Sequence, residues 1–196
     1  MTTLGVVALQ GAVGEHLAML TALGVTARTV RTPAELEGLD GLVLPGGEST
    51  AMARAAAKVE LFARIRQLRQ DGLAILGTCA GLVLLAERVA DAGALAGFAT
   101  VGGLDVTARR NAFGGQLSSF TTHLEVAGLE GPAFGAVFIR APQVLDPAPQ
   151  VEVLARTVPD GPVVAVRQGR LLATSFHPEL TLDDRIHRLF VETCVS

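Results

Sequence analysis

Short apolar segments alternate with segments of helical periodicity through the first half of the chain, and this alternation restricts the fold more than any other feature. Short apolar runs bounded by polar residues and glycine are typical of buried parallel strands. The predicted strands are Leu4–Leu9, Thr26–Val30, Gly41–Leu44 and Leu73–Leu76, and the predicted helices are one ending at Gly24, a short one from Pro33, a long one over about 49–70 and one over Leu82–Val89. Elements in this order form a parallel sheet covered on both faces.

The second half, from Ala99 onward, is rich in strands. The predicted strands are Leu104–Ala108, Gln116–Val126, Ala136–Ile139, Val163–Val166 and Leu171–Phe176, with a hairpin turn at Gln168-Gly169. Thr181 and Asp184 have the spacing of a capping box that would begin a C-terminal helix towards Cys194. We therefore expect an α/β fold, a three-layer sandwich with a mostly parallel central sheet. The length of 196 residues fits one domain spanning 1–196.

Composition excludes several classes of protein. A net charge of −3 without Trp or Tyr argues against nucleic-acid binding, which favours a basic face and stacking aromatics. The longest apolar stretch, Gly72–Ala86, is too short to cross a bilayer, and the N-terminal residues lack the basic start of a signal peptide. Two cysteines, Cys79 and Cys194, do not make a disulfide framework. We expect a cytoplasmic protein that does not contact membranes.

Gly77-Thr78-Cys79-Ala80-Gly81 is the strongest local motif, because it lies between an apolar strand and a helix. Glycines on both sides of a central nucleophile are typical of the strained strand-to-helix turn called a nucleophile elbow, here with sulfur in place of oxygen. Such a turn lies at the carboxyl end of a parallel strand, where α/β sheets bind ligands. The pattern predicts that Cys79 is a nucleophile, although most free cysteines are small buried apolar residues.

A thiol nucleophile needs a base and a group that orients the base. His177 follows an apolar strand, and Glu179 lies two residues later on the same side of an extended segment. These two residues complete a predicted triad with Cys79. The other histidines have simpler interpretations: His16 and His123 as surface or packing residues, and His187 as an intrahelical partner of Asp183. No histidine pair has metal-ligand spacing supported by cysteines, so no metal site is expected.

Acyl transfer also requires donors that stabilise an oxyanion. The N–H of Ala80, directly after the nucleophile, is one natural donor. Pro45-Gly46-Gly47-Glu48-Ser49 ends a neighbouring predicted strand, and the N–H of Gly47 is a candidate for the second. A glycine pair before a helix can instead hold a phosphate, but the Gly-Lys-Ser/Thr ending of a P-loop is missing.

The segments PGGEST, GTCAGL and HPELT, in this order and on these elements, resemble the triad glutamine amidotransferases, whose fold is the class I, flavodoxin-like sandwich. A narrower resemblance, to the glutaminase subunits of pyridoxal 5′-phosphate synthase, covers nearly the whole chain. It rests on GVVALQG at Gly5–Gly11, Glu15-His16, RNAFG at Arg110–Gly114, FIRAP at Phe138–Pro142, and Asp183, Arg185 and His187.

This resemblance implies hydrolysis of L-glutamine to L-glutamate and ammonia through a cysteine thioester, without a cofactor. The ammonia would be channelled, within a large hetero-oligomer, to a synthase subunit that makes pyridoxal 5′-phosphate from a pentose phosphate and glyceraldehyde 3-phosphate. Cys79 would be the nucleophile, His177 the acid and base, and Glu179 its orienting group. The residues implied to bind glutamine are Gly47, Glu48, Ser49, Arg110, Ile139 and Arg140.

Two departures and three alternatives accompany this interpretation. Ala12 stands where the family often has an acidic residue, and Gly115 where it often has a charged one. The chain could be the glutaminase of another amidotransferase, such as imidazole glycerol phosphate synthase, which binding to purified synthases would reveal. It could be a non-catalytic regulatory module, against which the complete triad speaks. It could also be a cysteine peptidase or stress-type hydrolase, which would need a larger pocket.

Overall fold

The computed structural model describes residues 2–113 and 119–195 and contains one large mixed sheet. Its strand order is β2-β1-β3-β4-β12-β11-β9-β6-β5, and β10 pairs with β11. The strands are β1 (Thr3–Val7), β2 (Thr26–Val30), β3 (Gly41–Leu44), β4 (Ala74–Thr78), β5 (Ala86–Val89), β6 (Leu104–Arg109), β9 (Gln143–Leu145), β10 (Glu152–Arg156), β11 (Val163–Gln168) and β12 (Leu171–Thr174). Strands β7 (Ser119–Leu124) and β8 (Phe134–Ile139) form a separate antiparallel pair.

The parallel part of the sheet runs from β2 through β1, β3 and β4 to β12. Beyond β12 the pairing is antiparallel, apart from the parallel pair of β5 and β6. The predicted α/β sandwich with a mostly parallel sheet and the predicted hairpin at Gln168-Gly169 are therefore confirmed.

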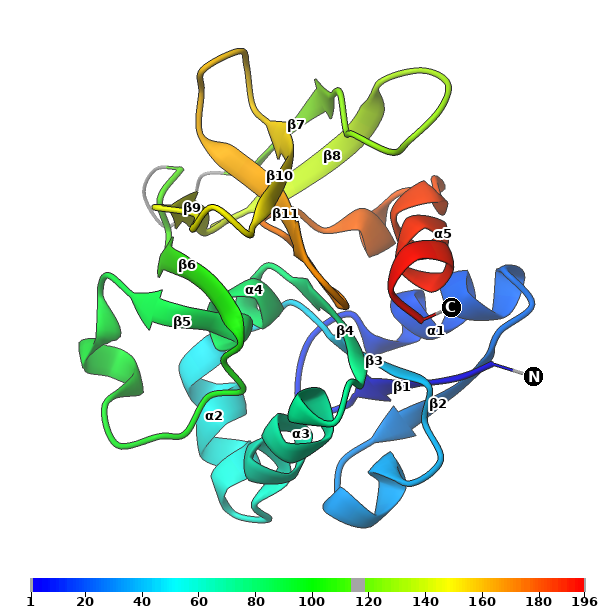
Figure 1. Cartoon of the computed structure of the whole chain (residues 1–196), viewed down its shortest axis with the longest axis vertical. Helices are drawn as coiled ribbons and strands as arrows, with labels where there is room; N and C mark the ends of the chain where they lie inside the picture. The colour runs from blue at the N-terminus through cyan, green and yellow to red at the C-terminus, as the bar shows by residue number, and fades with distance from the viewer. Residues whose placement is uncertain (1, 114–118, 196) are drawn as a thin grey trace.

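Helices cover both faces of the sheet, as Figure 1 shows. The α-helices are α1 (Val13–Ala22), α2 (Ser49–Ala57), α3 (Leu61–Gln70), α4 (Ala80–Leu85) and α5 (Arg185–Phe190). Short 3₁₀ turns are η1 (Pro33–Leu36), η2 (Ala92–Leu95) and η3 (Pro178–Leu180), and η4 (Val191–Val195) is a π-helical turn. Two apolar layers result, one under α2, α3 and α4 and the other under α1, α5 and β8.

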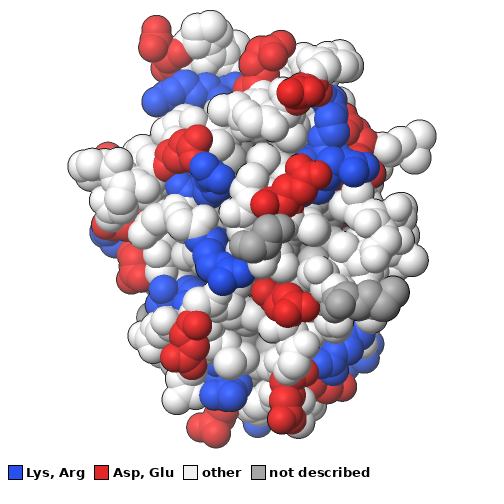
Figure 2. Space-filling view, turned by 45° about the vertical axis from the view of Figure 1, so that its right-hand side comes forward, with Lys and Arg blue, Asp and Glu red and all other residues white. Residues whose placement is uncertain are grey.

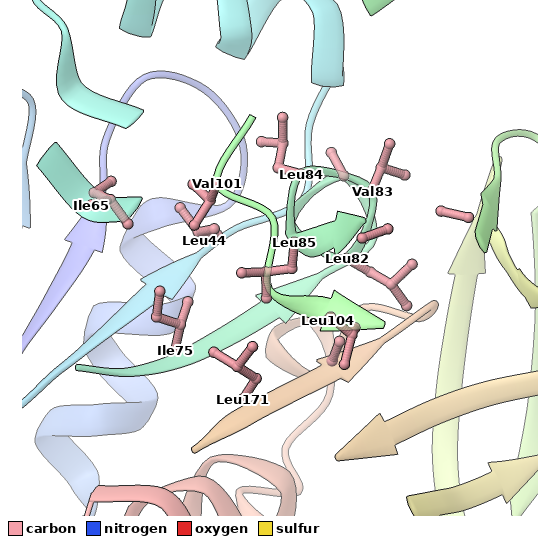
Figure 3. Close-up of a cluster of buried hydrophobic side chains, with 14 of the residues drawn as sticks. Leu44, Ile65, Ile75, Leu82, Val83, Leu84, Leu85, Val101, Leu104 and Leu171 are labelled. Carbon is pink, nitrogen blue, oxygen red and sulfur yellow. The ribbon is translucent and has the colours of Figure 1, made fainter. Parts of the chain in front are cut away.

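Alternate residues of the central strands supply the two layers. In β4, Ile75 packs with the layer under α2–α4, whereas its neighbour Leu76 packs with the opposite one. In β12, Leu171 and Leu172 divide in the same way. This period of two follows from the pleat of a strand. Figure 3 shows the leucine and valine side chains of α4 together with Leu44, Ile75 and Leu104 from strands of the sheet.

The predicted long helix over 49–70 is wrong as a single element. Helix α2 ends at Ala57, and Glu60 adopts a left-handed conformation with a φ of 57° before α3 begins. The break has a packing reason, because it turns Leu61, Phe62 and Ile65 into the core and leaves Val59 40% exposed. A continuous helix would have used Val59 as a core residue.

The predicted helix over Leu82–Val89 is also wrong in its second half. Helix α4 ends at Leu85, and the remainder is strand β5, which pairs with β6. The reason is burial: every residue of α4 is buried, whereas Glu87 and Arg88 on β5 are exposed at the sheet edge. The predicted strand Gln116–Val126 is described only as Ser119–Leu124, and residues 116–118 lie outside the described part of the chain.

The prediction of a capping box formed by Thr181 and Asp184 is also wrong. Asp184 precedes α5 without a capping hydrogen bond from its side chain. Instead the Asp183 carboxylate accepts the N–H of Arg185 at 3.1 Å, and the Thr181 hydroxyl accepts the N–H of Asp183 at 3.2 Å. The turn before α5 is therefore held by Thr181 and by Asp183, one position before the Asp184 that the spacing suggested.

Charged side chains of both signs are interspersed over the face in Figure 2. Several form exposed pairs, such as Arg88 with Asp105 at 2.7 Å and Arg167 with Glu152 at 2.7 Å. Within the described residues, no helix combines the length and hydrophobicity needed to cross a bilayer.

Candidate active site

Cys79 occupies the turn between β4 and α4. Its φ of 48° and ψ of −103° lie outside the usual regions for a residue with a side chain, as expected for a strained elbow. The turn is held in place because the Cys79 N–H donates to the carbonyl of Thr174 at 2.8 Å and so extends the pairing of β4 with β12. The turn places Cys79 at the carboxyl end of the parallel strands, where the residue is 7% exposed.

Both glycines of the elbow are required by close packing. A Cβ on Gly81 would lie 2.0 Å from the carbonyl oxygen of Leu44, and one on Gly77 would lie 2.7 Å from Leu85 Cδ1. These distances are far below van der Waals contact, so α4 can approach β3 and β4 only because both positions lack side chains. The sequence expectation for Gly77 and Gly81 therefore has a direct geometric basis.

His177 and Glu179 lie beside the thiol. The His177 N–H donates to the carbonyl of Val137 on β8 at 2.8 Å, and the ring Nδ1 donates to Glu179 Oε1 at 2.7 Å. The Glu179 side chain is fully buried in η3, and His177 is 9% exposed. The structure therefore brings together the three residues of the predicted triad.

The electrostatic environment of His177 favours the imidazolium. Burial alone would lower the pKa of His177, but hydrogen bonds to Cys79 and Glu179, with the charges of both, raise that pKa to about 10. Groups that accept a hydrogen bond from the charged form raise the pKa of a base. At neutral pH, His177 is therefore protonated.

The loop after β3 passes directly over His177. A Cβ on Gly46 would lie 2.3 Å from His177 Cε1, and a Cβ on Gly11 would lie 1.8 Å from the carbonyl oxygen of Gly46. Gly47 has a φ of +152°, and the next residue, Glu48, donates its N–H to Gln10 Oε1 at 2.9 Å. Gly46 thus permits close approach to the imidazole, which no side chain at this position would allow.

A cavity of about 400 Å³ opens in front of the thiol. It is lined by Gln10, Gly11, Gly47, Glu48, Ser49, Cys79, Ala80, Val83, Arg110, Asn111, Ile139, Arg140, Pro142 and His177. Every predicted site residue except Glu179, which lies behind His177, borders this cavity. A volume of this size is at the small end of the range for small-molecule sites.

Arg110 forms one wall of the cavity and is held from two sides. Its Nε donates to Asp91 Oδ2 at 2.8 Å, and its Nη1 donates to the hydroxyl of Thr50 at 3.2 Å and lies 3.9 Å from Glu48 Oε1. Burial opposes ionisation of Asp91, but the hydrogen bonds from Arg110 lower the pKa of its carboxyl. The sequence does not predict Asp91 as a site residue, because nothing in its local sequence connects it to Arg110.

Glu48 serves the local structure as well as the cavity. Its carboxylate accepts the N–H groups of Thr50 at 2.9 Å and Ala51 at 2.7 Å, which caps α2. Burial works against the charge, but these two hydrogen bonds lower the pKa of Glu48. Two further lining residues are Ile139, which ends β8, and Arg140, which follows with a φ of 44°.

Two histidines lie where the sequence did not predict them. His187 does not pair with Asp183, whose carboxylate binds Arg185; instead its Nε2 lies 2.8 Å from Nδ1 of His16. Both rings are fully buried, and His16 Nε2 lies 3.5 Å from Glu179 Oε2. Helical periodicity alone could not reveal this contact, because it joins residues 171 positions apart.

The remaining sequence expectations concern residues outside the cavity. Ala12 directly precedes α1 and is half-buried, whereas Gly115 lies outside the described residues. His123 is exposed on β7, as expected for a surface histidine. Across 2–113 and 119–195, no three His, Cys, Asp or Glu side chains are arranged to hold a metal ion. Cys79 and Cys194 are both free thiols.

Comparison with known proteins places the chain among glutamine amidotransferases. The model of the SNO glutamine amidotransferase family matches residues 6–196. Two similar curated proteins, both called pyridoxal 5′-phosphate synthase subunit PdxT, come from Nocardioides sp. and Streptomyces coelicolor. The first is 55% identical over 97% of this chain and 94% of its own length, and the second is 50% identical over 96% and 92%.

Solved structures agree with the fold. A structure described as a glutamine amidotransferase superposes with a TM-score of 0.89 at 45% identity and covers 98% of this chain and 99% of its own. A chain of PurLQS from Thermotoga maritima superposes with a TM-score of 0.68 over 97% of this chain and 98% of its own. Its identity is only 16%, so that likeness concerns the fold alone.

Proposed function

The chain belongs to the SNO glutamine amidotransferase family, and from this premise we propose that Cys79, His177 and Glu179 hydrolyse L-glutamine to L-glutamate and ammonia. It is a glutaminase subunit of pyridoxal 5′-phosphate synthase and supplies ammonia for the synthesis of that compound. The observation that carries the catalytic assignment is a strained thiol and a protonated imidazole at the wall of one cavity, with a buried carboxylate behind the imidazole.

The reaction begins with attack of the Cys79 thiolate on the side-chain amide carbon of glutamine. His177, whose pKa is raised to about 10, is the protonated partner of this step at neutral pH. Attack forms the carbon–sulfur bond and places a negative charge on the amide oxygen. His177 then gives its proton to the leaving nitrogen, and ammonia departs from the thioester. Water, deprotonated by His177, attacks the thioester to release glutamate and regenerate the thiol.

The N–H groups of Ala80 and Gly47 are proposed to hold the oxyanion. Ala80 is the first residue of α4, so its N–H has no carbonyl within the helix to bind. Gly47 directly follows Gly46, which packs on His177, and it borders the same cavity as Ala80. A donor of this kind contributes about 3 kcal/mol to transition-state stabilisation in other acyl-transfer enzymes.

We further propose that Gly47, Glu48, Ser49, Arg110, Ile139 and Arg140 bind glutamine, because all of them border the cavity. Arg110 and Arg140 offer planar cations suited to the α-carboxylate of an amino acid. The small cavity suits a single amino acid better than a peptide, which speaks against the peptidase alternative.

The wider assignments are proposals as well. Residues 1–196 are assigned to one glutaminase domain, supported by apolar layers that run along both faces of the sheet. The synthase subunit is the partner that receives ammonia, in a large hetero-oligomer. The two free cysteines support a reducing compartment such as the cytoplasm.

The test is glutamate release from L-glutamine by the purified chain, with and without the synthase subunit from the same organism. Strong stimulation by that subunit is expected. High activity that is indifferent to it would retain the glutaminase but contradict its role in this complex. Stimulation by an imidazole glycerol phosphate synthase partner instead would favour the other amidotransferase. No release under either condition would support the regulatory module.

A further inference from the structure

Glu179 has two carboxylate oxygens, and the proposed mechanism uses only one. Oε1 accepts the hydrogen bond of His177 at 2.7 Å. Oε2 is fully buried and makes no hydrogen bond with any described residue. A buried carboxylate oxygen without a donor is costly, so the surroundings of Oε2 need an account.

His16 on α1 is the polar group that faces this oxygen. Its Nε2 lies 3.5 Å from Glu179 Oε2 and 3.4 Å from the hydroxyl of Thr78. Its other nitrogen, Nδ1, lies 2.8 Å from Nε2 of His187 on α5. Two fully buried histidines thus continue the line of Cys79, His177 and Glu179 into the protein interior.

The protons in this pair can be assigned from the partners of the four ring nitrogens. One proton lies between His16 Nδ1 and His187 Nε2, because they are at hydrogen-bond distance. If His16 carried it, His16 Nε2 would present a lone pair to the carboxylate. His187 would then carry its own proton on Nδ1, which is buried and has no acceptor among the described residues. In that arrangement the lone pair of His16 Nε2 would face a lone pair of the carboxylate, and the His187 Nδ1–H would lack an acceptor.

The other arrangement removes both problems. His187 carries its proton on Nε2 and donates to His16, which carries its proton on Nε2 and points it at Glu179. The only nitrogen left without a partner is His187 Nδ1, which then bears a lone pair rather than an N–H. In this arrangement the Thr78 hydroxyl, 3.4 Å from His16 Nε2, would accept from the same proton.

We infer that His16, with its Nε2–H aimed at Glu179 Oε2 and its tautomer fixed by a hydrogen bond from His187, is a positioning residue for the catalytic carboxylate. His16 does not touch the thiol; it acts through Glu179, which holds His177. The separation of 3.5 Å exceeds that of an ordinary hydrogen bond, so the N–H acts on the buried carboxylate as an electrostatic contact. The inference rests on the proposed roles of Glu179 and His177.

The charges around the pair agree with two neutral rings. Burial, followed by the charges of His187 and His177, lowers the pKa of His16 well below its usual value. Burial likewise lowers the pKa of His187 to about 4, against the opposing effect of Asp184. The groups that face the pair are Glu179 and His177 from the η3 region, Thr78 from β4 and Asp184 beside α5.

The tautomers can be measured in the unmodified chain by nitrogen NMR after ¹⁵N labelling of histidine. Neutral rings protonated on Nε2 are expected for both His16 and His187 between pH 6 and 8. A ring protonated on Nδ1 at either position would overturn the inference. This measurement does not depend on glutaminase activity, so its failure is distinguishable from a failure of the proposed function.

The positioning role is tested by the matched pair His16→Gln and His16→Leu. Glutamine keeps an N–H donor near the position of Nε2, whereas leucine fills the space without one. We expect His16→Leu to lower kcat about tenfold in the complex with the synthase subunit, with KM changed less than twofold, and His16→Gln to retain most of kcat. Equal losses in both variants, or no loss in either, would contradict the role.

A second readout follows the thiolate directly. The rate of Cys79 alkylation by iodoacetamide, measured against pH in the isolated chain, reports the pH at which the thiolate forms. In His16→Leu this midpoint should rise by about one pH unit, because a less well held carboxylate stabilises the His177 imidazolium less. An unchanged midpoint would overturn the inference even if turnover falls. If His16→Leu does not fold, His187→Met against His187→Gln applies the same test one residue further from the site.

Discussion

His177 and His187 belong to one line of polar side chains, in which Glu179 and His16 lie between them. Their pKa values are shifted in opposite directions. The pKa of His177 is raised to about 10, whereas that of His187 is lowered to about 4. Burial disfavours the charged form of both rings. The difference is that His177 meets Cys79 and Glu179, whereas His187 meets a neutral histidine. Residue type and burial therefore do not decide which histidine performs acid–base chemistry; the charge of its neighbours does.

Cys79→Ala should have the largest effect on both glutamate release and the pKa of His177. It removes both the nucleophile and one of the two acceptors that hold the proton on His177, so glutamate release should fall to the uncatalysed background. The pKa of His177, followed by NMR, should drop below about 10 at the same time. Cys194→Ala is the matched control, because this thiol is buried beside α5 and borders no part of the cavity. Undiminished activity in Cys79→Ala would refute the assignment.

Glu179→Gln should have the next largest effect, because it keeps a hydrogen-bond acceptor beside His177 but removes the charge. Loss of the orienting carboxylate in a related triad costs about 10⁴-fold in kcat, so we expect roughly 10²- to 10⁴-fold here. The loss must be smaller than that of Cys79→Ala. Steady-state glutamate release in the complex is the measurement. A loss as large as that of Cys79→Ala would mean that Glu179 does more than orient the imidazole.

Burial of His187 should make the free energy of unfolding depend on pH. Unfolded histidine binds its proton near pH 6.5, whereas folded His187 resists protonation down to about pH 4, so the unfolded state binds more protons between these values. Stability should therefore fall as the pH is lowered from 6.5 towards 4. From pH 7 to pH 5, His187 alone should remove about 2 kcal/mol from the free energy of unfolding.

Urea denaturation of the wild type and of His187→Met at pH 7 and pH 5 measures this contribution. The variant should lose less stability across the interval, because it lacks the group that protonates on unfolding. Parallel losses in the two proteins would contradict the burial argument. His177 works in the opposite direction, since its contribution is fully present below pH 6.5 and is lost as the pH rises through about 10.

The same contrast explains what the sequence could and could not predict. The elbow at Cys79 and the pair His177 and Glu179 are local patterns, whose spacing follows from strand and turn geometry. The contact of His16 with His187 is not local, because it arises only when α1 and α5 pack on the same face of the sheet. Each histidine alone resembles an ordinary packing residue. Only their pairing beside Glu179 points to a role in positioning that carboxylate.

The errors in secondary structure have the same origin. The apolar spacing over 49–70 fits one helix, but the positions of Leu61 and Phe62 in the core require a break at Glu60. Ala86–Val89 extends a helical pattern, but pairing with β6 makes it a strand. In both cases the competing interaction comes from residues outside the segment itself. Tertiary packing therefore overrides the local helix propensity.

Asp91→Asn should have the smallest effect on glutaminase activity. His16, His187 and Glu179 are buried, whereas the Asp91–Arg110 pair is accessible to solvent. The two side chains are 45% and 20% exposed, and exposed ion pairs contribute little. We expect KM for glutamine to rise roughly two- to fivefold, with little change in kcat, because a less well held Arg110 binds the substrate less well. Asp105→Asn, which breaks a comparable exposed pair with Arg88 away from the cavity, should leave KM unchanged. A larger effect of Asp91→Asn on kcat than on KM would show that Arg110 participates in the chemical step, and exposure would then be a poor guide to the importance of a charge at this site.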